Sequence, residues 1–327
     1  MGSKRHFTSQ VRRVVIAANM ASCPGREWLS GILRYMAERR TNWSWRLLRS
    51  ERELSAESLA RLSKDGLDGF ILANPLVDDA ATRLSRSRFP LVIVGKQIVP
   101  DPIAKRRNVA MISADNGYIG KLAAGHFLHV GGFASFGFIG TKTRRAWSSL
   151  RLEGYSGELK RHGISCVAYS RCDDGIGRRY LSEFLALLPK PAAVFAAWDY
   201  RALDVTGVCR ECGISIPGQI SLIGVDNDPV VCESAGMSLT SIDQGGEEIG
   251  YKAAEILDRM MSRGRITGTR CFCCGSPRVV PRHSTNPIRT RRCLCRTRSP
   301  SSAERHAAAF RQSQLRTGWA FRGGFST

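Results

Sequence analysis

The chain has 327 residues, 43% of them hydrophobic, which suits one large globular domain or two of ordinary size and excludes a disordered chain. No run of about 18 apolar residues exists, so a membrane-spanning helix is excluded. The polar start leads us to expect no secretory signal and a cytoplasmic protein. The net charge of +21 is uneven, because residues 261–327 carry 14 Arg, no Lys and one acid, whereas the body is only mildly basic.

Short apolar strands and amphipathic helices alternate through the first third of the chain. Leu29, Ile32, Leu33 and Met36, for example, recur at helical spacing. We predict a disordered segment at 1–10, strands at 13–18, 45–48, 69–73 and 90–95, and helices at 27–40, 55–64 and 79–85.

The alternation continues from residue 109 onward. In this part we predict strands at 109–112, 135–140, 165–169, 192–197, 220–225 and 239–242. Helices are expected at 116–130, 151–162, 179–188, 199–212 and 247–261.

Continuous apolar strands separated by helices are typical of parallel sheets with helices on both faces. There are too many strands for one small sheet, and the halves 11–108 and 109–240 each hold four or five units. We therefore predict an α/β protein with two doubly wound parallel-sheet subdomains; a single larger sheet is the alternative. Ligands bind beyond the carboxyl ends of such strands, so we expect a ligand cleft between the subdomains.

Polar side chains follow several predicted strands or open the helices after them. The candidate ligand-binding residues are Arg26, Asp115, Asn116, Arg151, Trp198, Asp199, Asp226 and Gln244. Carboxylates and amides pair with vicinal hydroxyls, and an aromatic ring packs on the C–H face of a sugar, so the set favours a sugar or polyol. Other interpretations stay open: Asp115 and Asp199 can cap helices, Arg151 can be a surface residue and Trp198 a core residue.

Catalytic and metal-binding signatures are poor. The chain has no nucleotide-binding, serine-hydrolase or zinc-protease motif, so we expect no catalytic residue, no cofactor and no metal. Cys209 and Cys212 form a CxxC, but they fall on one face of a predicted helix, where buried Cys behaves as a small apolar residue. His126 and His129 are expected at an exposed helix end. The odd total of 11 Cys argues against a disulfide framework.

The basic C-terminal stretch has two interpretations. It can bind nucleic acid by neutralising phosphates. Alternatively, its Arg-rich, Lys-free composition is what a GC-rich gene yields when it is read out of frame. We favour an aberrant or unfolded tail over 286–327.

At the strand ends the chain resembles a known family. The segments 112–116, 149–155, 196–199 and 216–228 resemble the type I periplasmic-binding-protein-like sensor domain of the lactose-repressor-like superfamily. Within it, Asp228 with Cys232-Glu233, and the segment 238–243, are similar to xylose-operon regulators of the arabinose-regulator (AraC-type) family. The likeness covers about residues 11–285, and Trp198 stands where the family usually has Asn.

The resemblance implies the sensor of a DNA-binding transcription regulator, with a pentose such as xylose as effector and a homodimer as the assembly. It divides the chain into an N-subdomain, 11–108 plus 245–276, a C-subdomain, 109–244, and a last crossover strand, 277–285. Because no helix-turn-helix pattern follows Asn286, we expect the C-terminal DNA-binding part to be missing. The alternatives are a solute-binding or remnant protein with no DNA-binding output and, less favoured, an enzyme on the same fold.

Overall fold

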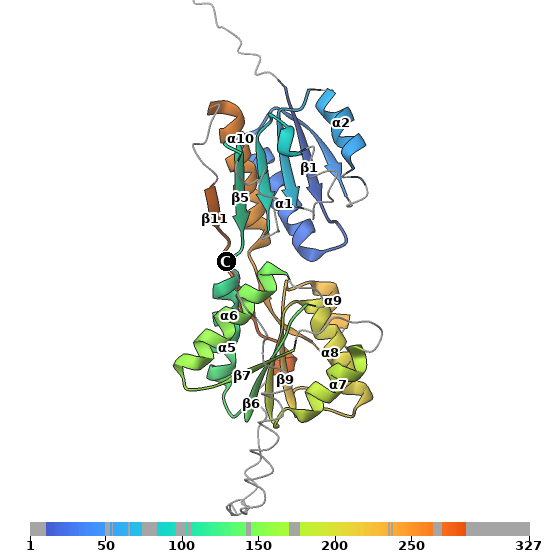
Figure 1. The fold of residues 1–327 in the computed structure, drawn as a ribbon, viewed down its shortest axis with the longest axis vertical. Helices are drawn as coiled ribbons and strands as arrows, with labels where there is room; N and C mark the ends of the chain where they lie inside the picture. Colours follow the sequence, from blue (N-terminus) through green and yellow to red (C-terminus); the bar gives the residue numbers. More distant parts are fainter. Residues whose placement is uncertain are drawn as a thin grey trace, which may run out of the picture. The chain divides into compact units, whose positions relative to one another are not determined.

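The strands form two separate six-stranded sheets in the computed structural model (Figure 1). The predicted α/β fold with two doubly wound parallel-sheet subdomains is thereby confirmed, and the alternative of a single larger sheet is wrong. The structure describes residues 11–49, 53, 55–64, 66–73, 84–95, 103, 106–141, 145–169, 177–234, 236, 238–263 and 270–285. The predictions made for 1–10, 79–83 and 286–327 lie outside these residues.

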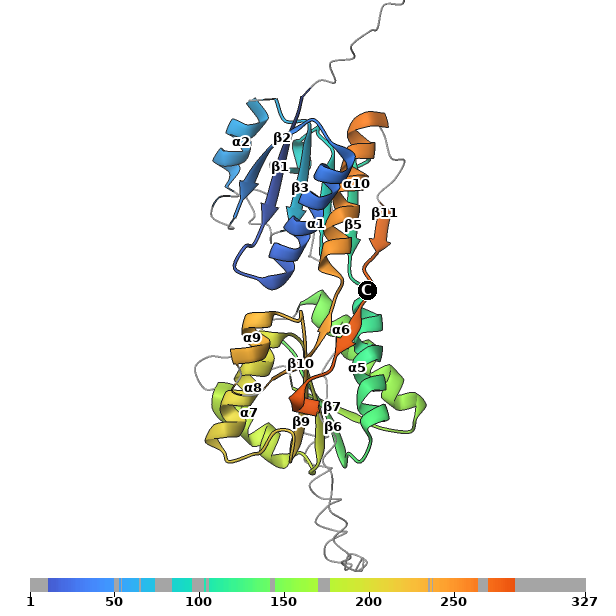
Figure 2. The ribbon, with the colours of Figure 1, turned by 180° about the vertical axis from the view of Figure 1, so that it is seen from behind.

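The first sheet has the strand order β11-β5-β4-β3-β1-β2, and all its pairs are parallel. Helices α1 and α10 lie side by side on one face (Figure 2), and α2 packs on the other. The elements are β1 (Arg12–Ala18), α1 (Cys23–Arg39), β2 (Trp43–Leu48), α2 (Ala56–Lys64), β3 (Gly69–Ala73), β4 (Leu91–Val94), β5 (Val109–Ser113), α10 (Gly246–Arg263) and β11 (Arg270–Cys273).

The second sheet has the order β12-β10-β9-β8-β6-β7 and is parallel except for the β10–β12 pair. Its elements are α5 (Asn116–Val130), β6 (Ser135–Ile139), α6 (Ala146–Arg161), β7 (Cys166–Tyr169), α7 (Gly177–Leu187), β8 (Ala192–Ala196), α8 (Asp199–Glu211), β9 (Ile220–Val225), α9 (Pro229–Ser234), β10 (Thr240–Asp243), β12 (Arg278–Val280) and a short 3₁₀ helix (His283–Thr285).

The chain crosses between the sheets at three places, 114–115, 244–245 and 274–277. Strand β5 pairs with β4, so the first crossing follows Ser113 and the predicted boundary after residue 108 is five residues too early. Strand β11 was not predicted, because Arg-Cys-Phe-Cys lacks the β-branched run that marks the other strands.

Two helices begin four or five residues earlier than predicted. Helix α1 begins at Cys23, because the Ser22 hydroxyl accepts a hydrogen bond from the Gly25 backbone N–H (3.3 Å) and caps the helix. Helix α6 begins at Ala146, although its first turn has no side-chain cap. Arg26 and Arg151 therefore project from within their helices. The prediction that each of them opens its helix is wrong.

Close backbone approach fixes how α5 packs on α6. A Cβ on Gly154 would lie 2.0 Å from the Gly117 carbonyl oxygen, and one on Gly120 would lie 2.1 Å from the carbonyl oxygen of Arg151. Only glycine allows this spacing. The contact holds the backbone of Arg151 beside the start of α5, where Asn116 lies.

Both sheets have fully buried strands at their centres. Strands β3, β8 and β9 are buried along their whole length, as expected for parallel strands covered on both faces. Phe70 belongs to the core of the first subdomain, and Phe138, Tyr155 and Phe195 to that of the second. Among the described helices, none combines the length and the apolar character that a bilayer crossing requires.

Candidate functional site

Buried polar side chains gather where the strands of the second sheet end and the chain crosses between the sheets. We call this group the strand-end cluster. Most of its side chains are buried, although polar residues are usually exposed, and each of them is held by hydrogen bonds to protein groups. Its members are Asn116, Arg151, Asp199, Asp226, Asp228 and Gln244.

Arg151 is the cation of the cluster and is only 3% exposed. Its Nε donates to Asn116 Oδ1 (2.9 Å), its Nη1 donates to the Ala197 carbonyl, and its Nη2 donates to Gln244 Oε1 (3.0 Å). The guanidinium also stacks on Trp147, 4.7 Å from the ring centroid. Burial lowers the pKa of Arg151 to about 10, against the attraction of nearby carboxylates, so the group stays charged at neutral pH.

Gln244 connects this cation to a carboxylate. Its Oε1 accepts from Arg151, and its Nε2 donates to Oδ1 of Asp226. Gln244 lies in the second crossing, directly after β10, so a side chain of the crossing itself bridges opposite charges. The three residues form a line with the Arg151 donor at one end and the Asp226 acceptor at the other. The Gln244 amide joins them.

Asp226 has a strained backbone as well as a buried carboxylate. Its φ of 112° and the φ of 51° at Asn227 lie in a region that favours glycine, and such strain is concentrated at functional sites. The Asp226 backbone N–H donates to the Ile242 carbonyl (2.9 Å), which fixes the turn after β9. Burial raises the pKa of the Asp226 carboxyl, and Arg151 opposes that rise.

Asp199 is fully buried and is held by hydrogen bonds from three groups of the protein. It accepts from the backbone N–H of Asp228 (2.9 Å), from Ser241 Oγ (2.6 Å) and from Cys232 Sγ (3.6 Å). A Cβ on Gly224 would lie 2.2 Å from Oδ1 of Asp199, so a glycine there makes room for the carboxylate. Burial raises its pKa, as does the charge of Asp226. Asp199 therefore positions the turn after β9, and the cap position of α8 belongs to Trp198.

Two contacts from α1 reach the same turn. Arg26 Nη2 donates to Oδ2 of Asp228 (3.0 Å), with the Arg26 side chain 41% exposed and that of Asp228 3% exposed. The Cys23 thiol donates to the carbonyl oxygen of Asp226 (3.7 Å). Helix α1 belongs to the first subdomain and the turn to the second, so these contacts join the two subdomains at the cluster.

Glu27, one residue after Arg26, lies against the start of α10. A Cβ on Gly246 would lie 2.1 Å from Oε2 of Glu27. Burial raises the pKa of Glu27 to about 7, and the charges of Asp243, Asp226 and Glu247 add to the rise. A carboxyl whose pKa lies near neutral therefore lies close enough to the cluster to feel the charge of Asp226.

Two predicted ligand-binding residues are placed differently. Asp115 is exposed, and its Oδ1 accepts from the Tyr118 backbone N–H (2.9 Å), so it caps α5. Trp198 is half-buried against the core, with its ring 5.3 Å from that of Tyr200. Neither residue bonds to the cluster, and the capping and core interpretations that the sequence left open account for both.

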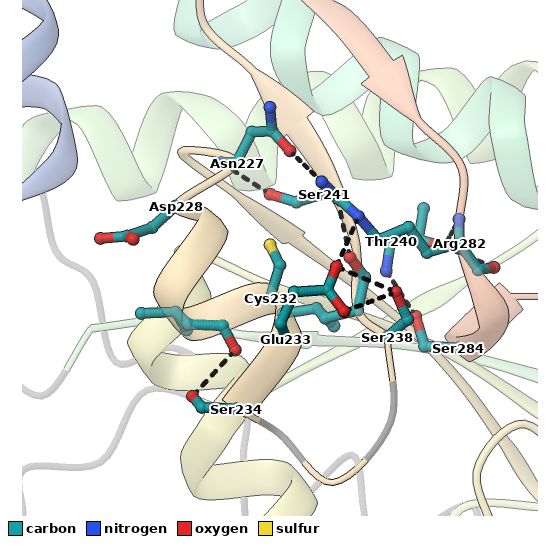
Figure 3. A network of polar contacts seen from close by, with 12 residues as sticks. Asn227, Asp228, Cys232, Glu233, Ser234, Ser238, Thr240, Ser241, Arg282 and Ser284 are labelled. Carbon is teal, nitrogen blue, oxygen red and sulfur yellow. Dashed lines mark hydrogen bonds and ion pairs between the residues drawn. The ribbon is translucent and has the colours of Figure 1, made fainter.

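The turn after β9 is also tied to the last described segment of the chain (Figure 3). Arg282 donates to Asn227 Oδ1 (2.8 Å) and to the Leu239 carbonyl (3.0 Å). Ser284 Oγ accepts from the Thr240 backbone N–H (2.8 Å) and donates to the Leu222 carbonyl. The segment after β12 is therefore fixed to the residue that follows Asp226.

Within the described residues, no group of three or more His, Cys, Asp or Glu side chains lies together as a metal site would require. Cys209 is buried, whereas Cys212 is exposed. The prediction that both lie on one buried helix face is therefore wrong for Cys212. His126 is half-buried, and its Nε2 lies 2.8 Å from Oγ1 of Thr285, so the predicted exposed helix end is wrong for this residue.

Some residues at the site were not among the predicted ligand-binding residues. Asp228 was visible as the last acid of the run at 225–228, but no pattern separated its role from that of Asp226. Cys23 and Glu27 lie in the part of α1 that was predicted to be a loop or a helix start. Trp147 lies in the first turn of α6, which was predicted to be a loop, so its stacking on Arg151 had no sequence signal.

Comparisons with known proteins agree with this architecture. Residues 124–285 match the family model of the periplasmic binding protein-like domain. The chain is 25% identical over 279 residues to the xylose operon regulatory protein of Haemophilus influenzae, a match that covers 80% of this chain and 68% of that protein.

Two solved structures have a similar fold. A LacI family transcriptional regulator from Enterococcus faecium with bound ribose has a TM-score of 0.66 at 23% identity, covering 85% of this chain and 100% of that one. A xylose-binding transcription activator has a TM-score of 0.67 at 20% identity, covering 96% of this chain and 77% of that one.

The two-subdomain fold is similar to that of periplasmic-binding-protein-like proteins, and the matching family model lies mostly over the second subdomain. Within that class, the chain resembles the sensors of the lactose-repressor-like regulators and the xylose operon regulatory proteins, which confirms the resemblance seen in the sequence. The matched proteins are regulators. The narrower arabinose-regulator (AraC-type) assignment stays a prediction.

Proposed function

We propose that this chain is the effector-binding domain of a cytoplasmic transcription regulator and that its effector is a sugar, specifically a pentose such as xylose. The observation that carries the proposal is the buried line Arg151–Gln244–Asp226 at a crossing between the subdomains. The similarity to xylose operon regulatory proteins supports the choice of a pentose.

The chemistry of the line suits vicinal hydroxyls. Each hydroxyl both donates and accepts, so a diol can accept from the Arg151 guanidinium and donate to the Asp226 carboxylate. The Gln244 amide now makes these two bonds itself. A sugar would thus exchange with or extend the Gln244 bridge without leaving a buried polar group unpaired.

The proposed output follows from the crossings. Effector binding at the cluster would change how the two subdomains are oriented about 114–115, 244–245 and 274–277, which is hinge closure. The bond between Arg282 and Asn227 carries the same change to the segment after β12. DNA recognition would be the task of a part of the regulator other than the described sensor.

The test is calorimetric titration of the full chain with D-xylose, L-arabinose, D-ribose and D-glucose, paired with thermal melts. A sugar at about 100 times its Kd adds about 2.7 kcal/mol to stability, worth roughly 5–10 °C for a domain of this size. We expect one pentose to bind, and we expect Asp226→Asn and Arg151→Met each to lose that binding.

Asp115→Asn is the matched control, because it removes a carboxylate near the site and keeps a side chain that caps helices well. It should bind the sugar as the native chain does. Equal affinity in Asp226→Asn, Arg151→Met and the control would refute the site.

A further inference from the structure

A concave site lies at the end of the first sheet where its strands begin. It is a cavity of about 960 Å³ lined by six arginines, which we call the arginine basin: Arg12, Arg39, Arg40, Arg88, Arg106 and Arg107. Arg12 begins β1, and the strand-end cluster lies beyond the other end of that strand. The strand has seven residues, so the two sites are separated by roughly 20 Å at the usual rise per residue.

The basin keeps a large excess of positive charge. Its acidic lining consists of Asp68, which accepts from the Arg13 backbone N–H (2.7 Å), and Asp258, which accepts from the Tyr35 hydroxyl (3.0 Å). Arg106 donates to neutral acceptors, among them the carbonyls of Leu84 and Phe89.

The other arginines have donors to spare. Arg12 Nη1 is buried and has no hydrogen-bond partner. Across the residues that the structure describes, no hydrogen bond or ion pair engages the guanidinium groups of Arg39, Arg40, Arg88 and Arg107. A buried cationic donor without an acceptor is costly, and a phosphate oxygen in the basin would supply the acceptor.

The backbone conformation of Arg40 is a second indication that an arginine is needed at this position. It is the C-cap of α1 and has a φ of 49°, a left-handed conformation in which glycine is the favoured residue. A cation at a helix C-terminus interacts well with the helix dipole, but that accounts for Arg39 and Arg40 only. It does not account for the arginines that β1 and the loops before β4 and β5 bring to the same cavity.

We propose that the arginine basin binds a small anion with two or more phosphate groups. Arginine forks match phosphate oxygens in two-point hydrogen bonds, and arginines on several sides suit more than one phosphate. The cavity volume is at the upper end of the range for small-molecule sites. A nucleic acid would instead follow an extended basic groove. The site is separate from the proposed sugar site and does not depend on it.

The experiment titrates the full chain with inorganic phosphate, pyrophosphate, tripolyphosphate and ATP at 150 mM NaCl by calorimetry. We expect saturable one-to-one binding of the polyphosphates and much weaker binding of phosphate. The double variant Arg88→Gln/Arg107→Gln should weaken tripolyphosphate binding about tenfold or more. Arg40→Gly should weaken it severalfold while keeping or raising the melting temperature without ligand, because glycine suits that backbone.

The control removes the same charge elsewhere. Arg61→Gln/Arg179→Gln takes two exposed arginines from α2 and α7, and each of them pairs with a glutamate of its own helix. It should change tripolyphosphate affinity less than twofold. An equal loss in both double variants would show that net charge alone attracts the anion and would overturn the site.

A nucleic-acid interface has its own signature. If a 20-base-pair duplex binds through Arg88 and Arg107 while tripolyphosphate affinity is the same in the native chain and the double variant, the small-anion proposal is wrong. Saturable binding that the duplex does not displace would support it.

Discussion

The packing of α6 on α5 can be tested with two identical substitutions three residues apart. Gly154→Ala places a Cβ 2.0 Å from the Gly117 carbonyl oxygen, whereas a Cβ on Gly157 meets nothing within 4 Å. Both changes raise helix propensity by about 0.5–1 kcal/mol. Overpacking costs about 1–3 kcal/mol, and here backbone meets backbone, so no side chain can swing aside.

We therefore expect Gly154→Ala to lower the free energy of unfolding by about 1–2 kcal/mol and Gly157→Ala to raise it by about 0.5–1 kcal/mol. Urea denaturation measures both. Because the contact also sets Arg151 beside Asn116, sugar affinity should fall severalfold in Gly154→Ala and stay unchanged in Gly157→Ala. Equal stability of the two variants would show that the helices are not in backbone contact.

Three further results are expected. Burial raises the pKa of Glu27 from 4.5 to about 7. The contribution of Glu27 to stability is therefore largest below pH 4.5 and is lost as the pH rises through 7. Urea midpoints between pH 5 and 8 should fall less steeply in Glu27→Gln than in the native chain. Arg26→Gln removes a half-exposed ion pair and should cost less than about 1 kcal/mol in the same assay; a loss above about 2 kcal/mol would mean that Asp228 depends on Arg26 for its charge. Among the cysteines whose side chains the structure describes, iodoacetamide mapped by mass spectrometry should label the exposed Cys212 and Cys273 first, because burial raises the thiol pKa of Cys23, Cys209 and Cys232; rapid labelling of Cys23 would contradict its contact with Asp226.

The sequence was sufficient to predict the fold and most of the cluster for one physical reason. The carboxyl ends of parallel strands meet at one edge of a sheet, so polar residues after β8, β9 and β10 must come together. Asp226 and Gln244 were found in this way. Asp115 was not separable from them, because a residue that follows a strand also precedes a helix, and the structure shows Asp115 as the cap of α5.

Other features depend on contacts that no local pattern records. The burial of Asp199 requires Gly224 on the neighbouring strand, and its partners lie 29 to 42 residues away in the chain. Strand β5 has the same apolar pattern whichever sheet it joins, so only its pairing with β4 reveals the boundary. The arginine basin collects arginines from positions 12 to 107 at the amino ends of the strands, where no spacing rule links them.

The arrangement of the cluster also restricts which sugars could act as effectors. A ligand shifts a conformational equilibrium only through contacts that differ between the two states. Arg151 and Asp226 both belong to the second subdomain, so a sugar that touches only these two would bind without favouring closure. The bonds from Arg26 and Cys23 to the turn after β9 are the ones that join the subdomains. An effector must therefore gain contacts with α1 as well, and two pentoses of similar affinity can differ in output if only one of them reaches Arg26.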